Sequence, residues 1–430
     1  MRDIVAGYEA VVTDLESRVD VPVPGTGPRR PVALALGLFA LLLVVLTAVV
    51  AVVAPSAAPR HGMPYLEGPT WLDGWFQFDS GWYYAIAQNG YSYVPGQQSS
   101  IAFFPTYPMV VRAVGLVVGD VQVAGTIVTV LAGAGAAALF ALWASQRLSR
   151  TATRASVLLL LLYPYAFFLV ATMYADAMFL LTVIGAFVLL ERGHPWSAGL
   201  LGALATAGRP VGIAVAVGLV VRVLEIRAEG RGALAPTSAT TPPSGSGVRV
   251  GGRDLITSVR TLRLRDAGVL LSVLGFVGWC TYLYLSFGDP LAFVTAEASP
   301  GWDQGSGPRT WFKIAYLGQL FRGPWDLKIA LTVQALFCLA AVLLLRRVWR
   351  RFGWGYLAFC AVVLAIPLLG TKDFMGTGRY LIAAFPVVAA AGDALASSRH
   401  VRWLRPLVLS VFAVGLLLGT ALYARGYEVS

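Results

Sequence analysis

Long apolar runs recur along the chain, and each is about as long as a membrane crossing. The first occupies residues 31–54, and about 20 consecutive apolar residues form a helix that crosses the hydrocarbon core of a bilayer. Hydrophobic residues make up 57% of the 430-residue chain and charged residues only 13%, whereas soluble domains carry about 25% charged residues. The pattern therefore predicts an integral membrane protein whose apolar runs span the bilayer.

Clusters of arginine separate the apolar runs and indicate how the chain is oriented. Short cytoplasmic loops of membrane proteins are enriched in Lys and Arg, so we place the N-terminal tail, residues 1–30, and the basic clusters in the cytoplasm. The net charge of +11 follows from these clusters and does not indicate a nucleic-acid partner. We expect a multi-pass protein of a bacterial plasma membrane, in contact with membrane lipid. The main clusters are Arg147, Arg150 and Arg154; Arg346, Arg347, Arg350 and Arg351; and Arg399, Arg402 and Arg405.

With this orientation we predict an all-α, polytopic helical bundle of about eleven membrane segments. Two segments are short helices within residues 196–224, which we expect to meet at Arg209 in the sequence Gly-Arg-Pro. The run 103–119 is short and broken by prolines, so we expect it to lie along the membrane surface. The other predicted spans are residues 31–54, 121–145, 155–172, 177–191, 267–287, 327–345, 354–370, 380–397 and 406–423.

Three segments outside the spans complete the predicted organisation. Residues 55–120 form a first outer loop with interfacial helices, and residues 288–326 form a second outer loop. Residues 225–265 hold many arginines among Gly, Pro, Ser and Thr, a composition that predicts a flexible basic cytoplasmic loop without a core of its own. The cysteines and histidines lie far apart in the sequence, so neither type indicates a metal site.

The first outer loop contains an aromatic stretch, Trp71 to Pro108, that differs from the rest of the chain. Trp and Tyr residues crowd there around two carboxylates, Asp73 and Asp79. Aromatic side chains with one polar end collect at membrane–water interfaces. Two interpretations are open. The stretch is either an aromatic belt whose acids are merely solvated, or a site at which a carboxylate meets both a lipid and a water-borne hydroxyl.

Five ionisable residues are predicted to converge on the outer side: Asp79, Asp176, Arg209, Lys372 and Arg379. An ionisable residue at membrane depth is costly and by default marks a functional site. A carboxylate can take the proton of an attacking hydroxyl, and guanidinium groups can hold a departing phosphate. Structural roles are the alternative: Asp176 can cap the helix that follows it, Lys372 can be a loop cation, and Arg379 can anchor its helix at the interface.

Several motifs occur in a recognisable order along this topology. They are F-D-S-G-W-Y-Y-A-I-A-Q-N-G-Y (78–91), A-F-F-P-T-Y-P (102–108), Y-P-Y-A-F-F-L-V-A-T-M-Y-A-D-A-M-F (163–179), A-G-R-P-V-G-I (207–213) and G-R-Y (378–380). Together they resemble the PIG-V family of polyprenyl- or dolichyl-phosphate-mannose-dependent mannosyltransferases. The resemblance implies a transmembrane catalytic domain of the GT-C type within residues 31–424. It also implies inverting transfer of a sugar, usually mannose, from a lipid-phosphate donor.

The resemblance also implies that Asp79 is the catalytic acid of the first outer loop. We expect Arg209, Arg379 and Lys372 to bind the donor phosphate, and Asp176 and Tyr174 to support the site or to contact donor or acceptor. The family usually has Arg-Trp before the catalytic Asp, where Gln77 and Phe78 stand here, and commonly has Glu where Asp176 stands. The candidate sugar contacts are Trp82, Tyr83, Tyr91 and Trp302, with interface anchoring as the alternative.

The expected partners are a polyprenyl-phosphate sugar donor and a glycan, glycolipid or protein acceptor on the extracytoplasmic side. No cofactor is required by the sequence; Asp79 and Asp176 are able to share a divalent metal, although no spacing demands one. Two other functions stay open at this point. One is a transporter or flippase of a lipid-linked substrate, which also uses intramembrane charges. The other is a non-catalytic assembly subunit, which should tolerate the loss of Asp79.

Overall fold

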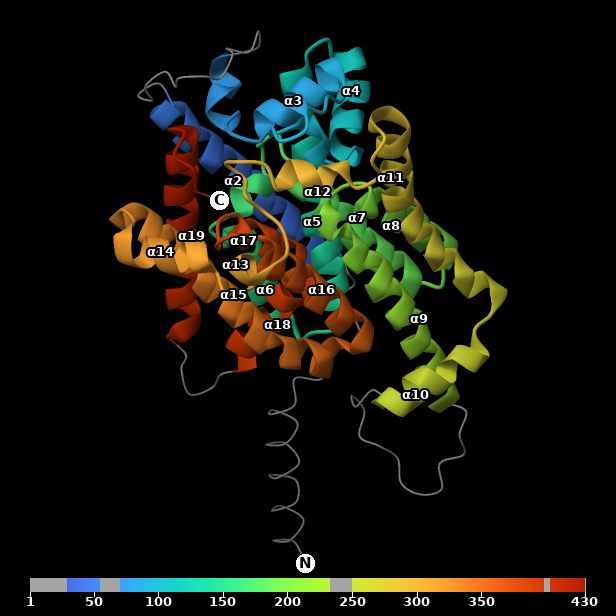
Figure 1. Ribbon diagram of the computed structural model, residues 1–430. Helices are drawn as coiled ribbons and strands as arrows, with labels where there is room; N and C mark the ends of the chain where they lie inside the picture. The colour runs from blue at the N-terminus through green and yellow to red at the C-terminus, as the bar shows by residue number, and fades with distance from the viewer. Residues whose placement is uncertain (1–28, 55–69, 233–249, 398–402, 430) are drawn as a thin grey trace, which may run out of the picture.

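The computed structural model describes residues 29–54, 70–232, 250–397 and 403–429, and within these residues all regular secondary structure is helical. The prediction of an all-α fold is therefore confirmed. Figure 1 shows a bundle with α3 (Ser80–Asn89) and α4 (Thr106–Val118) at one end and α10 (Gly252–Thr257) at the opposite end. Most of the predicted N-terminal tail lies outside the described residues.

Five helices in the described part of the chain are long and apolar enough to cross a membrane, and a bent pair raises the number to six. They confirm the predicted spans at residues 31–54, 121–145, 267–287, 327–345 and 406–423. The predicted count of about eleven membrane segments is not confirmed, since α16 (Trp354–Gly370) is apolar but only 17 residues long. The five helices are α2 (Arg29–Val53), α5 (Val121–Ser145), η7 (Leu264–Val273) continued by α11 (Leu274–Phe287), α15 (Trp325–Phe352) and α19 (Leu404–Ala424).

Two predicted spans are wrong as continuous helices, and a proline interrupts each. At residues 155–172, α6 (Arg150–Leu162) ends before Pro164, and a separate turn, η4 (Ala166–Leu169), follows. At residues 380–397, the segment of α17 (Thr377–Tyr380) and η8 (Leu381–Ala383) meets α18 (Phe385–Ser397) at an angle of 85°, with Pro386 in the first turn of α18. Proline lacks an N–H and disfavours helical geometry in the residue before it, so neither helix continues through it.

The short helices predicted within residues 196–224 are present. They are α8 (Pro195–Thr206) and α9 (Ile213–Gly232), which flank Arg209 and the turn η5 (Pro210–Gly212). The segment 225–265 differs from the predicted flexible loop at both ends, because α9 continues to Gly232, and α10 and η6 (Ser258–Thr261) follow. An ion pair of 2.6 Å between Arg227 and Asp266 links α9 to η7. Residues 233–249 lie outside the described residues.

Short helices form both predicted outer loops. The first contains η2 (Thr70–Trp75), α3, η3 (Ser100–Ala102) and α4 within its described part. The second contains α12 (Ala292–Glu297), α13 (Pro308–Trp311) and α14 (Ile314–Arg322). Because α12 packs against η3, the second outer loop lies on the first, although about 190 residues separate them.

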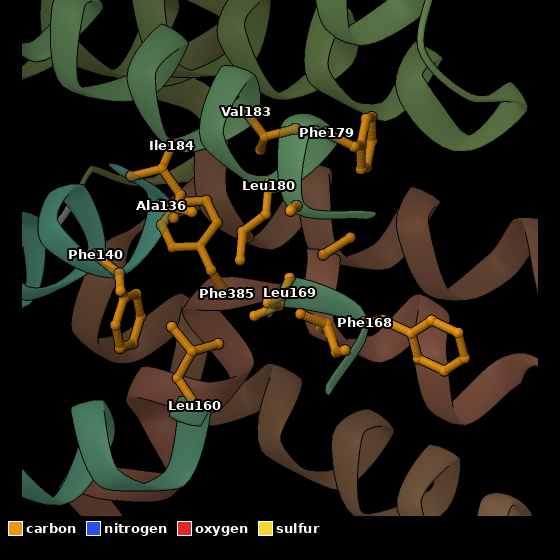
Figure 2. Close-up of a cluster of buried hydrophobic side chains, with 14 of the residues drawn as sticks. Ala136, Phe140, Leu160, Phe168, Leu169, Phe179, Leu180, Val183, Ile184 and Phe385 are labelled. Carbon is orange, nitrogen blue, oxygen red and sulfur yellow. The ribbon is translucent and has the colours of Figure 1, made fainter. Parts of the chain in front are cut away.

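The helix α7 (Asp176–Glu191) lies at the centre of the bundle, and most of its side chains are buried. A helix that is apolar on all sides is expected to be surrounded by other helices. Its two end residues are both carboxylates, about 22 Å apart along the helix axis. Figure 2 shows Phe179, Leu180, Val183 and Ile184 of α7 in a cluster with Ala136 and Phe140 of α5, Leu160 of α6, Phe168 and Leu169 of η4, and Phe385 of α18.

Candidate active site

A cavity of about 540 Å³ lies near the N-terminal end of α7. Small-molecule sites commonly have volumes of about 300–1,000 Å³. Its walls come from the start of α3, the break between α8 and α9, the end of α12 with the loop after it, the C-terminal end of α16, and α17. The fold thus brings together segments that are far apart in the sequence. The predicted site residues that line the cavity are Asp79, Tyr83, Arg209, Trp302, Lys372 and Arg379.

Asp79 reaches the cavity from a strained turn that two tyrosines hold in place. Phe78, directly before it, has a φ of +52°, a left-handed conformation that is rare for a bulky residue. The hydroxyl of Tyr174 accepts the N–H of Asp79 at 3.1 Å and donates to the carbonyl of Gln77 at 3.3 Å. The hydroxyl of Tyr423 also donates to this carbonyl, at 3.1 Å. Since the Asp79 side chain is 29% exposed, its carboxylate is fixed in position but open to the cavity.

The guanidinium of Arg379 lies between the carboxylates of Asp79 and Asp176. Its Nη1 donates to Oδ2 of Asp79 at 3.0 Å, and its Nε lies 3.9 Å from Oδ2 of Asp176. The rings of Phe168 and Tyr174 flank the guanidinium, with centroids 5.2 and 5.0 Å from Cζ. Arg379 is buried, and its Nε–H has no hydrogen-bond partner among the described residues. This Nε–H is enclosed and lies toward Asp176. Arg379 nevertheless lines the cavity, and a guanidinium carries five N–H donors, of which Nη1 supplies the one bonded to Asp79.

Arg209 reaches the cavity from the break between α8 and α9. Its Nη1 forms an ion pair with Oδ1 of Asp176, and its Cζ lies 4.6 Å from the ring centroid of Tyr380. The backbone at Gly212 packs closely against the end of α8: a Cβ at this position would lie 2.4 Å from the carbonyl oxygen of Ala205. Asp176 is buried and lies behind the two arginines, since it does not line the cavity itself.

The four side chains form a row in which the charges alternate: Asp79, Arg379, Asp176, Arg209. Such pairing meets the requirement that an ion at membrane depth has a partner of opposite charge. Both arginines line the cavity whereas Asp176 does not. The cluster therefore offers the cavity two cations and one carboxylate, a set of groups suited to binding an anion and taking up a proton.

Lys372 is tied to the second outer loop. Its Nζ pairs with Oδ2 of Asp303 at 2.9 Å and donates to the carbonyl of Gly301 at 2.9 Å. The hydrogen bond from the Lys372 ammonium holds the pKa of the Asp303 carboxyl below its usual range. Because the side chain of Asp303 is exposed and that of Lys372 is partly exposed, this pair contributes little to stability. It does hold the loop at the rim of the cavity.

The predicted sugar contacts fall into two groups. Tyr83 and Trp302 line the cavity, and Trp82 packs edge-on against Trp302 with ring centroids 5.8 Å apart. Tyr91 lies elsewhere: its hydroxyl donates to the carbonyl of Phe103 at 3.0 Å and its ring packs on α11. Of the four candidates, therefore, two line the cavity, Trp82 contacts one of these two, and Tyr91 does not line the cavity.

The motifs at 78–91, 163–179 and 207–213 thus supply the acids and one arginine of a single cluster. Residues 67–228 match the family model Mannosyltransferase (PIG-V). The match confirms the resemblance that the motifs indicate, and it supports a glycosyltransferase. The G-R-Y motif at 378–380 lies outside the matched segment, yet its Arg379 contacts Asp79 and completes the cluster that the PIG-V segment begins.

Among solved structures, the chain is similar to the archaeal oligosaccharyltransferase AglB from Archaeoglobus fulgidus in complex with an inhibitory peptide and a dolichol-phosphate. The sequence identity is 11% and the TM-score 0.42. The similarity covers 91% of this chain and 56% of the AglB chain, so this chain spans little more than half the length of that protein. Comparison with curated proteins found no match.

Two ionisable residues near the cavity lie outside the PIG-V motifs, and the sequence does not predict them. Glu297, the last residue of α12, lines the cavity, and burial raises its pKa to about 7. Lys313 has a φ of +51° and donates to the carbonyls of Thr371 at 2.6 Å and Pro367 at 3.3 Å. Burial lowers the pKa of its ammonium to about 8. No motif marks either residue, because each acquires its surroundings from the packing of the second outer loop.

Within the residues that the structure describes, His, Cys, Asp and Glu form no group of three or more suited to a metal ion. The guanidinium of Arg379 lies between Asp79 and Asp176 and contacts both. Asp73, the other acid of the first outer loop, is exposed and does not line the cavity. The carboxylate that the cluster presents is therefore that of Asp79.

Proposed function

We propose that this protein is an inverting glycosyltransferase of the GT-C type, which moves mannose from a polyprenyl-phosphate donor to a hydroxyl acceptor. The observation that carries the proposal is that Asp79, Arg209 and Arg379 line one cavity, in a chain whose residues 67–228 match the PIG-V family. A base for the acceptor and cations for the departing phosphate are the groups that this reaction needs.

In the proposed reaction, Asp79 takes the proton of the acceptor hydroxyl, and that oxygen attacks the anomeric carbon of the donor sugar. The new carbon–oxygen bond forms on the face opposite the phosphate, while the bond from the anomeric carbon to the phosphate oxygen breaks. The polyprenyl phosphate leaves with the electron pair, and the configuration inverts. Arg209 and Arg379 stabilise the negative charge that develops on the phosphate, with Lys372 at the rim as a further cation.

The contacts of Arg379 support this division of roles. Nη1 of Arg379 holds the base, Asp79, at 3.0 Å, its Nε lies toward Asp176 at 3.9 Å, and the residue lines the cavity. One guanidinium can therefore orient the base and donate to a phosphate oxygen at the same time, since it carries five N–H donors. Tyr174 and Asp176 act as positioning residues: Tyr174 fixes the backbone of Asp79, and Asp176 pairs with both arginines.

The extracytoplasmic location of the cavity is part of the proposal, and α15 supports it. Leu327, in the first turn of this spanning helix, lines the cavity, whereas Arg350 and Arg351 lie in its last turn. An excess of arginine marks the cytoplasmic end of a span. The opposite end of α15, and the cavity beside it, then face the extracytoplasmic side.

The test is a transfer assay on the purified full-length protein with polyprenyl-phosphate mannose, with Asp79→Asn beside wild type and a chelator in a parallel reaction. Wild type should release polyprenyl phosphate, and Asp79→Asn should lower the rate by about 10²–10⁴-fold while the unfolding temperature stays close to that of wild type. Full activity of Asp79→Asn would refute the role of the base. A folded wild-type protein without turnover on any lipid-phosphate sugar would refute the enzyme and favour a transporter or an assembly subunit. The chelator shows whether a metal takes part.

A further inference from the structure

One wall of the cavity is built by the second outer loop and takes no part in the reaction as described above. Residues 297–306, here called the 297–306 wall, supply a carboxyl, an indole, an amide and a hydroxyl group. The wall contains neither lysine nor arginine, whereas the two buried cations, Arg209 and Arg379, come from the α8–α9 break and α17. The wall therefore offers the cavity mainly neutral and acidic hydrogen-bonding groups, and the cation that reaches it is Lys372, which pairs with Asp303 at the rim. The side chains of the wall that line the cavity are those of Glu297, Trp302, Gln304 and Ser306.

The 297–306 wall is held in place from several directions. The N–H of Gly305 donates to the carbonyl of Gly370 at 2.8 Å, which ties the wall to the end of α16. Lys372 ties it through Gly301 and Asp303. The ring of Trp302 packs on Trp82 of α3, and α12 packs on η3. Binding to a wall that is already ordered avoids the entropy loss of ordering a loop, so the arrangement is suited to recognition.

Of the two acids in this wall, Asp303 is paired with Lys372, whereas Glu297 is left without a partner by the described residues. Within the described residues its carboxyl group forms no hydrogen bond and no ion pair, in contrast to Asp79, which is paired with Arg379. Burial is what raises the pKa of Glu297 to about 7. A partly buried carboxyl without partners is costly for a fold, and the cost is offset when a ligand supplies the missing donors.

We propose that the 297–306 wall binds a carbohydrate acceptor, with the Glu297 carboxylate accepting hydrogen bonds from the sugar hydroxyl groups. The inference rests on the proposed function and names the acceptor class for it. A sugar offers several hydroxyl groups beside an apolar ring face. The carboxylate accepts from the hydroxyls, Gln304 and Ser306 can donate and accept, and the Trp302 ring can pack on the sugar face. The side chain of a serine or threonine brings a single hydroxyl and no apolar ring face on which Trp302 could pack.

The test uses the full-length protein with polyprenyl-phosphate mannose, an alkyl mannoside as sugar acceptor and a Ser/Thr-containing peptide as the alternative acceptor. Wild type, Glu297→Gln and the control Asp326→Asn are compared; Asp326 is an exposed acid in the same outer region that does not line the cavity. Release of polyprenyl phosphate to water, without acceptor, measures the donor half of the site. Glu297→Gln should raise KM for the mannoside by about 10–100-fold, because a charge-assisted acceptor is lost. Its kcat and its donor hydrolysis should stay close to wild type, and Asp326→Asn should match wild type throughout.

The outcomes separate this inference from the proposed function. An unchanged mannoside KM in Glu297→Gln, a fall in kcat alone, or a clear preference for the peptide would overturn the carbohydrate assignment while the enzyme still turns over. Absence of donor turnover in wild type would instead overturn the proposed function, and the acceptor assignment with it.

The wild-type protein gives a second readout that needs no variant to fold. The mannoside KM should fall as pH rises from about 6 to about 8, because the ionised form of Glu297 is the stronger acceptor. In Glu297→Gln the fall in KM over this pH range should be lost or clearly smaller than in wild type, because the contribution of Glu297 is removed. A wild-type KM that is constant over this range would contradict the role of Glu297. The other charged or titratable side chains that line the cavity are Asp79, Tyr83, Arg209, Lys372, Asp373, Arg379, Tyr380 and Glu428.

Discussion

The two ends of α7 carry ionic clusters of similar composition but different construction. At the C-terminal end, Glu191 accepts from Arg222 at 2.8 Å and from the hydroxyl of Tyr356 at 3.0 Å, and it pairs with Arg147 at 3.3 Å. At the N-terminal end, Asp176 pairs with two arginines, one of which keeps a donor without a partner within the described residues. Each end thus has a buried or half-buried carboxylate shared by two arginines.

The residues of the Glu191 cluster bond, within the described part of the chain, only to one another and to neighbouring protein groups, so this cluster is closed. The Asp176 cluster is open, because its arginines, Arg209 and Arg379, line the cavity. Glu225 accepts the N–H groups of Trp354 and Gly355 at 2.7 and 3.2 Å, which caps the N-terminal end of α16, and it also pairs with Arg222 at 2.9 Å. None of these residues lines the 540 Å³ cavity. A fully satisfied polar network makes a bundle rigid, whereas a network with an open face can exchange one of its partners for a ligand. We infer that the closed cluster serves stability and the open one serves function.

Glu191→Gln should produce the largest loss of stability. It removes the charge-assisted bonds of Glu191 to Arg147 and Arg222, and hydrogen bonds to charged groups contribute about 1.5–3 kcal/mol each. Arg147 loses its carboxylate partner, whereas Arg222 keeps Glu225 and Glu229. The free energy of unfolding, from denaturant titration in detergent, measures the effect. Glu229→Gln is the matched control, because Glu229 contacts the same Arg222 but its side chain is 40% exposed. A variant that unfolds like wild type yet has lost turnover would reverse the assignment of the two clusters.

Asp176→Asn should also destabilise the protein, but its loss should respond to anions. With the carboxylate gone, Arg209 and Arg379 face the cavity without their shared partner, and a bound phosphate group can take its place. An anion at about 100 times its Kd adds about 2.7 kcal/mol of stability. Thermal unfolding with and without inorganic phosphate or polyprenyl phosphate tests this recovery. If Glu191→Gln recovers to the same extent, the distinction between an open and a closed cluster is lost.

Glu297→Gln should stabilise the protein at alkaline pH. The pKa of Glu297 in the fold is about 7, against an ordinary value of 4.5, so between these values the folded protein binds more protons than the unfolded one. Wild-type stability therefore falls as pH rises through this window, and the full cost is present above pH 7. The variant should be more stable by up to about 3 kcal/mol at pH 8 and should match wild type near pH 4. An equal gain at both pH values would point to a cause other than ionisation.

Two tyrosine variants, one at each end of α7, compare the two clusters, and they should have the smallest effects on stability. Tyr356→Phe removes hydrogen bonds to Glu191 and Trp143, and Tyr174→Phe removes those to Asp79 and Gln77. Each should cost about 0.5–1.5 kcal/mol per lost bond. Only Tyr174→Phe should lower turnover, by about tenfold, because a small displacement of a catalytic group is enough for that. Equal turnover in the two variants would show that the Asp79 turn does not depend on Tyr174.

The sequence predicts the parts of this fold that depend on local composition. Long apolar runs with no proline beyond the first turn, such as α2 and α5, form helices at the positions that hydropathy predicts, and Gly-Arg-Pro correctly marks the break at Arg209. The run 155–172 fails as a continuous helix, because average hydropathy does not register the effect of one proline on backbone geometry. The count of about eleven membrane segments is not confirmed, because helices such as α7 are too short to be recognised as spans by length, and short buried helices rely on neighbouring helices for their stability.

The candidate site is predictable only in part, because its chemistry depends on contacts between distant segments. Asp79 and Arg209 stand out as ionisable residues at membrane depth or in an aromatic belt, whereas the position of Asp176 behind both arginines is visible only in three dimensions. Glu297 lies in an ordinary stretch of a loop, and its unusual environment comes from η3 and the end of α16. Nothing in its own sequence neighbourhood reports that packing.

The alternating row of Asp79, Arg379, Asp176 and Arg209 carries no net charge, and under the proposed function this affects the end of the catalytic cycle. A polyprenyl-phosphate sugar is a phosphodiester with one negative charge, but the released polyprenyl phosphate is a monoester whose charge at neutral pH is about −1.5 to −2. The same arginines then hold the product more firmly than the substrate. The structure thus favours slow departure of the spent carrier and inhibition by it. Both effects should weaken in acid, where the monoester takes up its second proton.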